Sequence, residues 1–230
     1  MNRGQACCAG AFVTGTDTGV GKTVVAAALL RALVRDGRRA VGMKPVAAGL
    51  AAGATVHADV GTLVAAGNVD APLADICPFS FALPIAPHLA AETDGVGIDL
   101  GTISAAYARL AATADAVVVE GAGGVLVPLS RRADMLDIPA RLGLPVLLVV
   151  GMRLGCLNHA LLSALAIGAR GLRLAGWVAN RIDPAMDRAD ASVAALRERL
   201  PAPLLADVDW NARGTPVFHD EAFPLSALGF

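Results

Sequence analysis

Short aliphatic runs alternate with longer segments that have the hydrophobic spacing of helices along the 230-residue chain. The short runs predict strands at residues 10–14, 40–43, 77–81, 116–119, 146–150, 175–179 and 204–206. The longer segments predict helices at residues 23–36, 59–66, 98–113, 157–168 and 187–200. Such alternation is typical of βαβ units, which build a mostly parallel sheet flanked by helices. Because no linker or internal repeat interrupts it, we expect a single α/β domain over residues 1–230, with residues 1–9 as a loose extension.

The composition excludes several classes of protein. Hydrophobic residues make up 55% of the chain and charged residues 17%, and the mean hydropathy of +0.59 is incompatible with intrinsic disorder. Aromatic residues make up only 4%, so surfaces that stack bases or sugars are not expected. The net charge of −1 gives no electrostatic footprint for nucleic acid, and no nucleic-acid partner is expected.

Residues 154–169 form the uncharged stretch that must be tested as a membrane span. The stretch is shorter than the about 18 apolar residues that a spanning helix needs, and it contains Asn158, His159 and Ser163. We therefore expect a buried helix here and no membrane contact. The N-terminus has no apolar segment of the signal-peptide type, and the cysteines lack metal-binding or redox spacing. A cytoplasmic protein with reduced thiols is the expectation.

The segment Gly15-Thr-Asp-Thr-Gly-Val-Gly-Lys-Thr23 directly follows a predicted strand and opens a predicted helix. This is the context of a phosphate-binding loop, in which backbone N–H groups and the helix N-terminus surround an anion. In that role Lys22 reaches the β- and γ-phosphates and Thr23 binds Mg²⁺. The first glycine stands one place earlier than in GxxxxGK[ST], and the alternative is a glycine-rich turn. Because Gly-Lys-Thr begins the helix, we expect a P-loop NTPase-type fold with nucleotide contacts from Gly19, Val20, Gly21, Lys22, Thr23 and Val24.

A second polar segment, Glu120-Gly-Ala-Gly-Gly124, follows the strand predicted at 116–119. Ligands of α/β proteins bind at the carboxyl ends of the strands, so Glu120 is expected to hold Mg²⁺ or its waters. The backbone would approach the nucleotide closely at Gly121, Ala122 and Gly123. The alternative is a strand-end turn with a solvated acid. Asp59 is a candidate for a second metal-binding carboxylate, although taken alone it is interpreted as a helix N-cap.

Together these segments resemble dethiobiotin synthetases, the ATP-dependent enzymes that close the ureido ring late in biotin synthesis. The resemblance covers almost the whole chain and is carried by FVTGTDTGVGKT (12–23), GMKPVAAG (42–49), PIAPHLAA (84–91), VVVEGAGGVLVPL (117–129), VLLVVGMRLGCLNHALLSAL (146–165), LAGWVANRIDP (174–184) and PAPLLADVDW (201–210). The early glycine of the phosphate loop is itself a feature of this family. The combination is far more specific than any single segment.

The resemblance implies a reaction and residues for it. The family joins CO₂ to the vicinal diamine 7,8-diaminononanoate, with Mg²⁺ as cofactor and ATP as co-substrate. One amine becomes a carbamate, the carbamate attacks the γ-phosphate, and the second amine closes the ring and expels phosphate. Lys44 matches the catalytic lysine, whose charge would act beside that of Lys22 on the carbamate and the phosphoryl group. Without the family, Lys44 is equally well interpreted as a solvated lysine at a strand end.

The resemblance assigns further positions along the chain. The metal would be held by Thr23, Asp59 and Glu120, and the substrate would contact Thr18, Lys44 and Ala48. Adenine and the nucleotide side of the site would be contacted by Asn180, Arg181, Asp209, Trp210 and Asn211. The remote carboxylate of the substrate would bind a helix N-terminus formed by Gly155, Cys156, Leu157 and Asn158. In this family that contact comes from the neighbouring subunit, so a homodimer with sites at the interface is implied.

The chain departs from the family pattern at several of these positions. Gly19 stands where an acidic residue is common, and Ala48 replaces a serine whose hydroxyl would contact substrate. Asp209 stands where proline is common, and Arg181 stands where an acidic residue can follow the asparagine. These departures bear on nucleotide preference and substrate affinity more than on the type of reaction.

Other functions share a phosphate loop. A related amidoligase acting on a larger cofactor precursor would carry a glutamine-amide-transfer domain, for which 230 residues leave no room. A partition-type ATPase has a signature lysine near the start of the loop, where this chain has Asp17. A purely structural α/β protein would not account for the loop, Lys44 and Glu120 together. We therefore expect an ATP- and Mg²⁺-dependent ligase that forms a cyclic urea from a diamine acid and CO₂.

Overall fold

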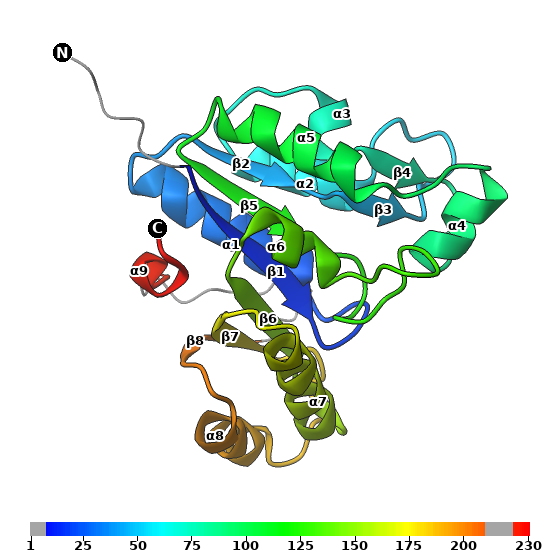
Figure 1. Cartoon of the computed structure of the whole chain (residues 1–230). Coiled ribbons are helices and arrows are strands. Elements are labelled where there is room, and N and C mark those ends of the chain that lie inside the picture. The colour runs from blue at the N-terminus through cyan, green and yellow to red at the C-terminus, as the bar shows by residue number, and fades with distance from the viewer. Residues whose placement is uncertain (1–7, 210–222) are drawn as a thin grey trace.

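A parallel sheet forms the centre of the protein (Figure 1). The computed structural model describes residues 8–209 and 223–230. Within them, the sheet has six strands in the spatial order β2 (Ala40–Met43), β5 (Ala116–Glu120), β1 (Ala9–Gly15), β6 (Val146–Gly151), β7 (Leu174–Asn180) and β8 (Leu204–Val208). A second, two-stranded parallel sheet pairs β3 (Val46–Ala48) with β4 (Phe79–Phe81).

Helices cover both faces of the central sheet, as the ribbon in Figure 1 shows. One face is covered by α1 (Lys22–Arg35) and α2 (Ala58–Ala66). The other face is covered by α5 (Leu100–Ala111), α6 (Asp137–Leu142) and α7 (Cys156–Ala169). The remaining helices of the described residues are α3 (Leu73–Ile76), α4 (Pro87–Thr93), α8 (Ala189–Arg199) and α9 (Leu225–Leu228).

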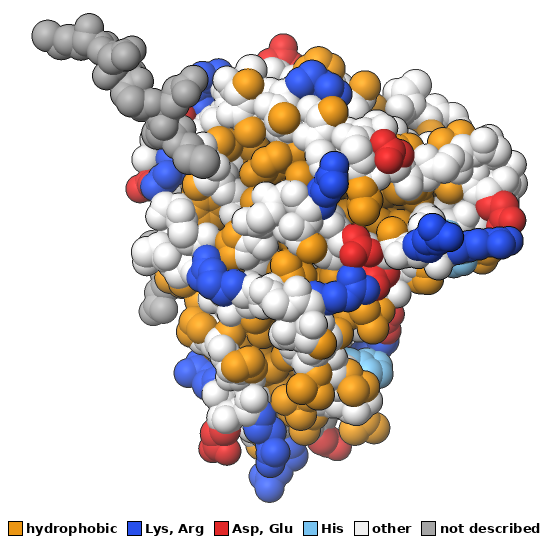
Figure 2. Space-filling view, viewed as in Figure 1, with side chains coloured by type: hydrophobic (Ala, Val, Ile, Leu, Met, Phe, Trp, Pro, Cys, Tyr) orange, Lys and Arg blue, Asp and Glu red, His pale blue; other side chains and the backbone are white. Residues whose placement is uncertain are grey.

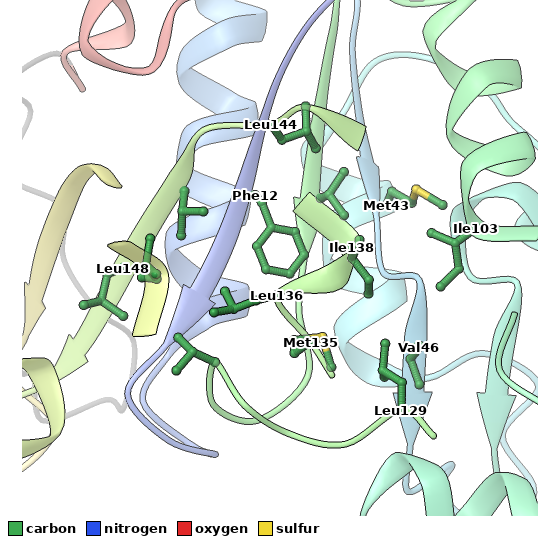
Figure 3. Packing of buried hydrophobic residues seen from close by; sticks show 14 of the residues in the cluster. Phe12, Met43, Val46, Ile103, Leu129, Met135, Leu136, Ile138, Leu144 and Leu148 are labelled. Carbon is green, nitrogen blue, oxygen red and sulfur yellow. The ribbon is translucent and has the colours of Figure 1, made fainter. Parts of the chain in front are cut away.

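The central strands are buried on both faces, which is why their sequences are almost continuous aliphatic runs. Every residue of β5 and β6 is buried. Along β1, Phe12 belongs to one apolar layer and Val13 to the other, because successive side chains point to opposite faces. Figure 3 shows Phe12 near Leu136 and Ile138 in the first of these layers. The apolar residues of the chain therefore fill two layers, one on each face of the sheet. No helix of the described residues has the length and apolarity to cross a membrane.

These elements confirm the expected fold class and most of the expected segments. Each predicted helix has ends within two residues of those observed, and each predicted strand is present. The strand expected at 77–81 is shortened to β4 and belongs to the small sheet. The pattern does not predict β3, α3, α4, α6 or α9, because segments of seven residues or fewer hold too little of a period. Of the expected extension at 1–9, residues 1–7 lie outside the described residues, and Ala9 already begins β1.

α7 corrects the expectation of a buried helix at residues 154–169. Ile167 is fully buried, but Leu162 is 56% exposed and Leu165 is 70% exposed. Leu154, in the turn before the helix, is 94% exposed. Figure 2 shows hydrophobic side chains on the surface over α7. This uncharged stretch therefore has one side packed in the core and another that is an exposed apolar surface. The sequence alone does not show which residues lie on which side.

The carboxyl ends of β2, β5 and β1 lie side by side at one edge of the sheet. Lys44 follows β2, Glu120 is the last residue of β5, and the loop at 15–23 follows β1. Parallel pairing thus brings three segments that are distant in the sequence to the edge where α/β proteins bind their ligands.

Candidate active site

The loop between β1 and α1 has the backbone geometry of an anion-binding site. Gly19 and Gly21 have φ angles of +74° and +89°, in the left-handed region that favours glycine. α1 begins at Lys22, and its N-cap Gly21 makes no side-chain cap, so the first N–H groups of the helix are available to a ligand. The loop therefore presents the concave, N–H-rich surface that the sequence predicts for phosphate binding.

A cavity of about 720 Å³ lies against this loop. Its loop side is lined by Thr18, Gly19, Gly21, Lys22, Thr23 and Val24. Its other sides are lined by Lys44, Ala47, Ala48, His57, Asp59, residues 84–87, Glu120, Ala122, Gly123 and Val127. The structure thus brings the phosphate loop, both lysines and both carboxylates of the sequence prediction to one cavity, together with an apolar wall.

Lys44 is buried and paired with two carboxylates. Its Nζ donates to Asp59 Oδ2 at 2.8 Å and to Glu120 Oε1 at 2.5 Å, and its side chain is only 4% exposed. Burial by itself would lower the pKa of Lys44, but the Glu120 and Asp59 carboxylates outweigh burial and hold this pKa above its usual value. Pro45 restricts Lys44 to extended backbone. The alternative of a solvated strand-end lysine is therefore wrong.

Glu120 is fully buried at the end of β5. Its Oε1 accepts from the hydroxyl of Thr23 at 2.8 Å as well as from Lys44. Its Oε2 is buried and has no hydrogen-bond partner among the described residues. Burial raises the pKa of Glu120, and the positive charge of Lys44 opposes this effect. The alternative of a solvated acid is wrong, and an unused acceptor oxygen remains at the site.

Lys22 differs from Lys44 in its surroundings. Its Nζ donates to the backbone carbonyl of Asp17 at 2.8 Å. Burial lowers the pKa of Lys22 to about 8, and the positive charge of Lys44 acts in the same direction. The sequence contains no lysine besides these two, since its other strongly basic side chains are arginines. Both lysines therefore line one cavity, as expected for a site that binds a highly charged anion.

Thr23, Asp59 and Glu120 provide oxygen donors that fit Mg²⁺. This ion is usually bound by one or two carboxylates, with waters and substrate phosphates completing its coordination. Glu120 Oε2 is an acceptor without a partner in the described chain, and the Thr23 hydroxyl is bonded to the same carboxylate. The described residues contain no group of three or more His, Cys, Asp or Glu side chains placed to form a closed metal site. The donor set therefore suits a magnesium ion that shares its coordination with a nucleotide.

His57 positions one of these carboxylates, a role that the sequence did not reveal. It is the N-cap of α2, and its Nδ1 accepts from the backbone N–H of Asp59 at 3.3 Å. Its Nε2 lies 3.0 Å from the carbonyl oxygen of Ala48 and therefore carries the proton, because Nδ1 is an acceptor. The interpretation of Asp59 as the N-cap is wrong. Asp59 stands in the first turn, and the nearby positive charge of Lys44 holds its pKa below the usual range despite burial.

The residues that the sequence analysis expects to contact the nucleotide lie in different parts of the structure. Asn180 is buried and does not line the cavity, and its side-chain amide donates to the backbone carbonyl of Val20 in the phosphate loop. Arg181 forms a bidentate pair with Asp207 at 2.9 Å for each contact, and Asp209 lies 3.5 Å from its Nε. Val20 is packed behind the loop and Gly121 packs against Phe12 and Met135. Trp210 and Asn211 lie outside the described residues.

The substrate-side residues fall into two groups. Thr18 and Ala48 line the main cavity with Lys44, as expected. Gly155, Cys156, Leu157 and Asn158 form the start of α7, with Gly155 as its N-cap, but they do not line that cavity. A second cavity of about 420 Å³ lies beside the helix, lined by residues 16–17, residues 124–128, His159, Leu162 and Ser163. Within one chain, the start of α7 is thus separate from the cavity that contains Lys44.

Comparison with known proteins finds relatives that match nearly the whole chain. A family model described as an AAA domain matches residues 9–217. The ATP-dependent dethiobiotin synthetase of Aromatoleum aromaticum is 56% identical over 89% of this chain and 92% of its own length. The synthetase of Nitrosospira multiformis is 55% identical over 88% of each chain.

Among solved structures, a ParA family ATPase from Chlorobium tepidum has a TM-score of 0.55 over 95% of this chain and 90% of its own. At 16% identity, this likeness shows the P-loop fold alone. The identity shared with the two synthetases along nearly the whole chain shows the family. The chain belongs to the ATP-dependent dethiobiotin synthetase family of enzymes.

Proposed function

We propose that the protein catalyses the ATP- and Mg²⁺-dependent closure of 7,8-diaminononanoate with CO₂ to dethiobiotin, releasing ADP and phosphate. The observation that carries this proposal is the position of Lys44 in a cavity that has the phosphate loop on one side and an apolar wall that includes residues 84–87 on another. A phosphate chain and an alkyl diamine would meet at its ammonium group. The names of the two relatives support the same function.

The reaction would proceed in three steps. The nitrogen of one amine attacks the carbon of CO₂ and, with loss of a proton, becomes a carbamate. A carbamate oxygen then attacks the γ-phosphorus and ADP leaves, which gives a carbamic–phosphoric anhydride. The second amine attacks the carbonyl carbon, the bond from that carbon to the phosphate oxygen breaks, and inorganic phosphate leaves as the ring closes.

The two lysines would serve different parts of this chemistry. Lys44 stays protonated because of its carboxylate partners, so it is suited to stabilise the negative charge of the carbamate and of the transferred phosphoryl group. Lys22, at the start of α1, would contact the β- and γ-phosphates together with the N–H groups of the loop. Mg²⁺, held by Thr23, Asp59 and Glu120, would neutralise phosphate charge when bound.

The apolar surface of α7 supports a homodimer. Leu154, Leu162 and Leu165 are exposed leucines close together in sequence, and Figure 2 shows hydrophobic atoms over this helix. A second copy covering this face would remove the leucines from water and would bring the start of its own α7 toward a neighbouring site. The free N–H groups there suit the remote carboxylate of the diamine. We also propose a cytoplasmic location, supported by unpaired thiols at Cys77 and Cys156.

The proposal is tested by incubating the protein with 7,8-diaminononanoate, ¹³C-bicarbonate and MgATP. We expect phosphate release that depends on the diamine and formation of ¹³C-labelled dethiobiotin, measured by mass spectrometry. Lys44→Ala should lower kcat at least about a hundredfold, since it removes the charge that would stabilise the transition state, while Lys44→Arg keeps a charge and serves as the matched comparison. Folded protein without diamine-dependent turnover would contradict the proposed function.

A further inference from the structure

Asn180, the last residue of β7, joins the central sheet to the phosphate loop. Its Nδ2 donates to the carbonyl oxygen of Val20 at 2.8 Å, and the two residues are 160 positions apart in the chain. Asn180 is only 3% exposed, so this hydrogen bond is shielded from water. A buried carbonyl that lost this donor would remain unpaired, which is costly.

Val20 is also held through its side chain. The residue is 1% exposed, and two glycines leave the space that it occupies. A Cβ at Gly15 would lie 2.6 Å from Val20 Cγ2, and a Cβ at Gly151 would lie 2.7 Å from Val20 Cγ1. The ends of β1 and β6 therefore fix the side chain of Val20, while the end of β7 fixes its carbonyl group.

The bond to Val20 determines the direction of the next N–H group. In a trans peptide the C=O and the N–H point in opposite directions, and the described residues contain no cis peptide. Because the Val20 carbonyl points to Asn180, the N–H of Gly21 points away from Asn180. Gly21 lines the cavity, and a Cβ on it would lie 2.1 Å from Asn180 Nδ2. The glycine and the amide are thus fitted closely to one another.

We propose that Asn180 is a positioning residue for the phosphate loop. Its amide fixes the Val20–Gly21 peptide so that the Gly21 N–H faces a bound phosphate, a role separate from the base contact implied by the family. The inference rests on the proposed function only in that the loop binds a polyphosphate. It predicts that Asn180 matters to a ligand that has no base at all.

The test compares two ligands on the full-length protein by isothermal titration calorimetry in Mg²⁺ buffer. Inorganic tripolyphosphate has phosphates without a base, and ADP has both. Asn180→Ala should weaken tripolyphosphate binding about tenfold. Binding must then order the freed Val20–Gly21 peptide, and the Val20 carbonyl stays without its hydrogen-bond donor. Asn180→Leu, which keeps the volume of the side chain without its donor, should behave in the same way.

Asn68→Ala is the matched control. Asn68 also donates Nδ2 to a backbone carbonyl, that of Arg38 at 3.0 Å, and its Oδ1 accepts from Ala40 at the opposite end of the strands. We expect this variant to lower the Tm and to leave tripolyphosphate affinity unchanged. If Asn180 had only a structural role, the Asn180 variants would likewise have a lower Tm and an unchanged tripolyphosphate affinity.

Several results would overturn the inference. A tripolyphosphate Kd within twofold of the unaltered protein in both Asn180 variants, with weaker ADP binding, would leave Asn180 as a base contact only. Failure of both variants to fold, while Asn68→Ala folds, would make it a structural residue, and absence of tripolyphosphate binding by the unaltered protein would also contradict it. Neither titration needs the diamine, so failure here is distinguishable from failure of the proposed reaction.

Discussion

Lys22 and Lys44 lie in one cavity with opposite electrostatic surroundings. Two carboxylates bind Lys44 directly, whereas the nearest hydrogen-bond acceptor of Lys22 is a backbone carbonyl. In the absence of ligand, burial and the positive charge of Lys44 therefore lower the pKa of Lys22 to about 8. A polyphosphate would supply the negative charge that Lys22 lacks.

This difference predicts the pH titration of the two lysines. Protein labelled with ¹³C-lysine should give two side-chain Cε signals, because the sequence contains only Lys22 and Lys44. The Lys22 signal should titrate with a midpoint near 8, and the Lys44 signal should not titrate until well above that pH. Bound tripolyphosphate should raise the Lys22 midpoint. The Lys22→Arg variant assigns the signals, and an ordinary lysine midpoint for Lys22 would contradict the account.

The lowered pKa of Lys22 also sets the sign of its effect on stability. Between about pH 8 and the usual lysine value, the unfolded chain binds a proton that the folded chain has released. The unfolding free energy contributed by this residue therefore increases with pH across that window.

Gly21→Ala and Gly19→Ala form a matched pair in the phosphate loop. Both residues have positive φ angles, so both variants incur a backbone strain of about 1 kcal/mol or more. A Cβ at position 19 meets nothing within 4 Å, whereas one at position 21 meets the Asn180 amide. We expect Gly21→Ala to lose far more stability and ADP affinity than Gly19→Ala, as measured by urea unfolding and calorimetry. Equal losses would show that the contact with Asn180 is unimportant.

At the scale of the element, His57 links the first turn of α2, which contains Asp59, to the β3 segment. His57→Ala removes the cap and the bond to Ala48, and it should lower the free energy of unfolding by about 1 kcal/mol. His57→Asn restores an N-cap acceptor but is too short to reproduce the Nε2 contact. We expect His57→Ala to raise the KM for Mg²⁺ as well. We expect His57→Asn to recover the free energy of unfolding but to keep the raised KM for Mg²⁺. Full recovery of both quantities would limit His57 to capping.

The exposed side of α7 is the second element with a testable role. Leu162→Asp and Leu165→Asp place a charge on the face that we assign to a second copy, so each should shift sedimentation toward the monomer and lower turnover. Val64→Asp on α2 is the control, since Val64 is 47% exposed on a helix of the opposite face of the sheet. A monomeric unaltered protein would contradict this assignment.

At the scale of the whole molecule, the edge of the sheet that forms the site could be predicted. The end of β1, Lys44 and Glu120 each follow a short aliphatic run, and parallel pairing must bring such ends together. The pairing of Lys44 with Asp59 could not be predicted, because it depends on the path of residues 49–57 between β3 and α2. Secondary structure and the edge of the sheet follow from local pattern, whereas side-chain partners follow from packing.

The same limit explains two other differences. The family resemblance implies a base contact for Asn180, and only its position beside Val20 in the structure reveals the hydrogen bond to the loop. The leucines of α7 have the same local pattern whether they face a core or the surface, so their exposure had to come from the structure.

The most direct test of the account follows oxygen from CO₂. In a short reaction with ¹⁸O-bicarbonate in unlabelled water, the carbamate oxygen that attacks the γ-phosphorus should leave with the phosphate when the ring closes. We predict inorganic phosphate that carries an ¹⁸O label in step with dethiobiotin formation, and loss of both products in Lys44→Ala. Phosphate that forms with the diamine present but carries no label would contradict the carbamate mechanism and the role assigned to Lys44.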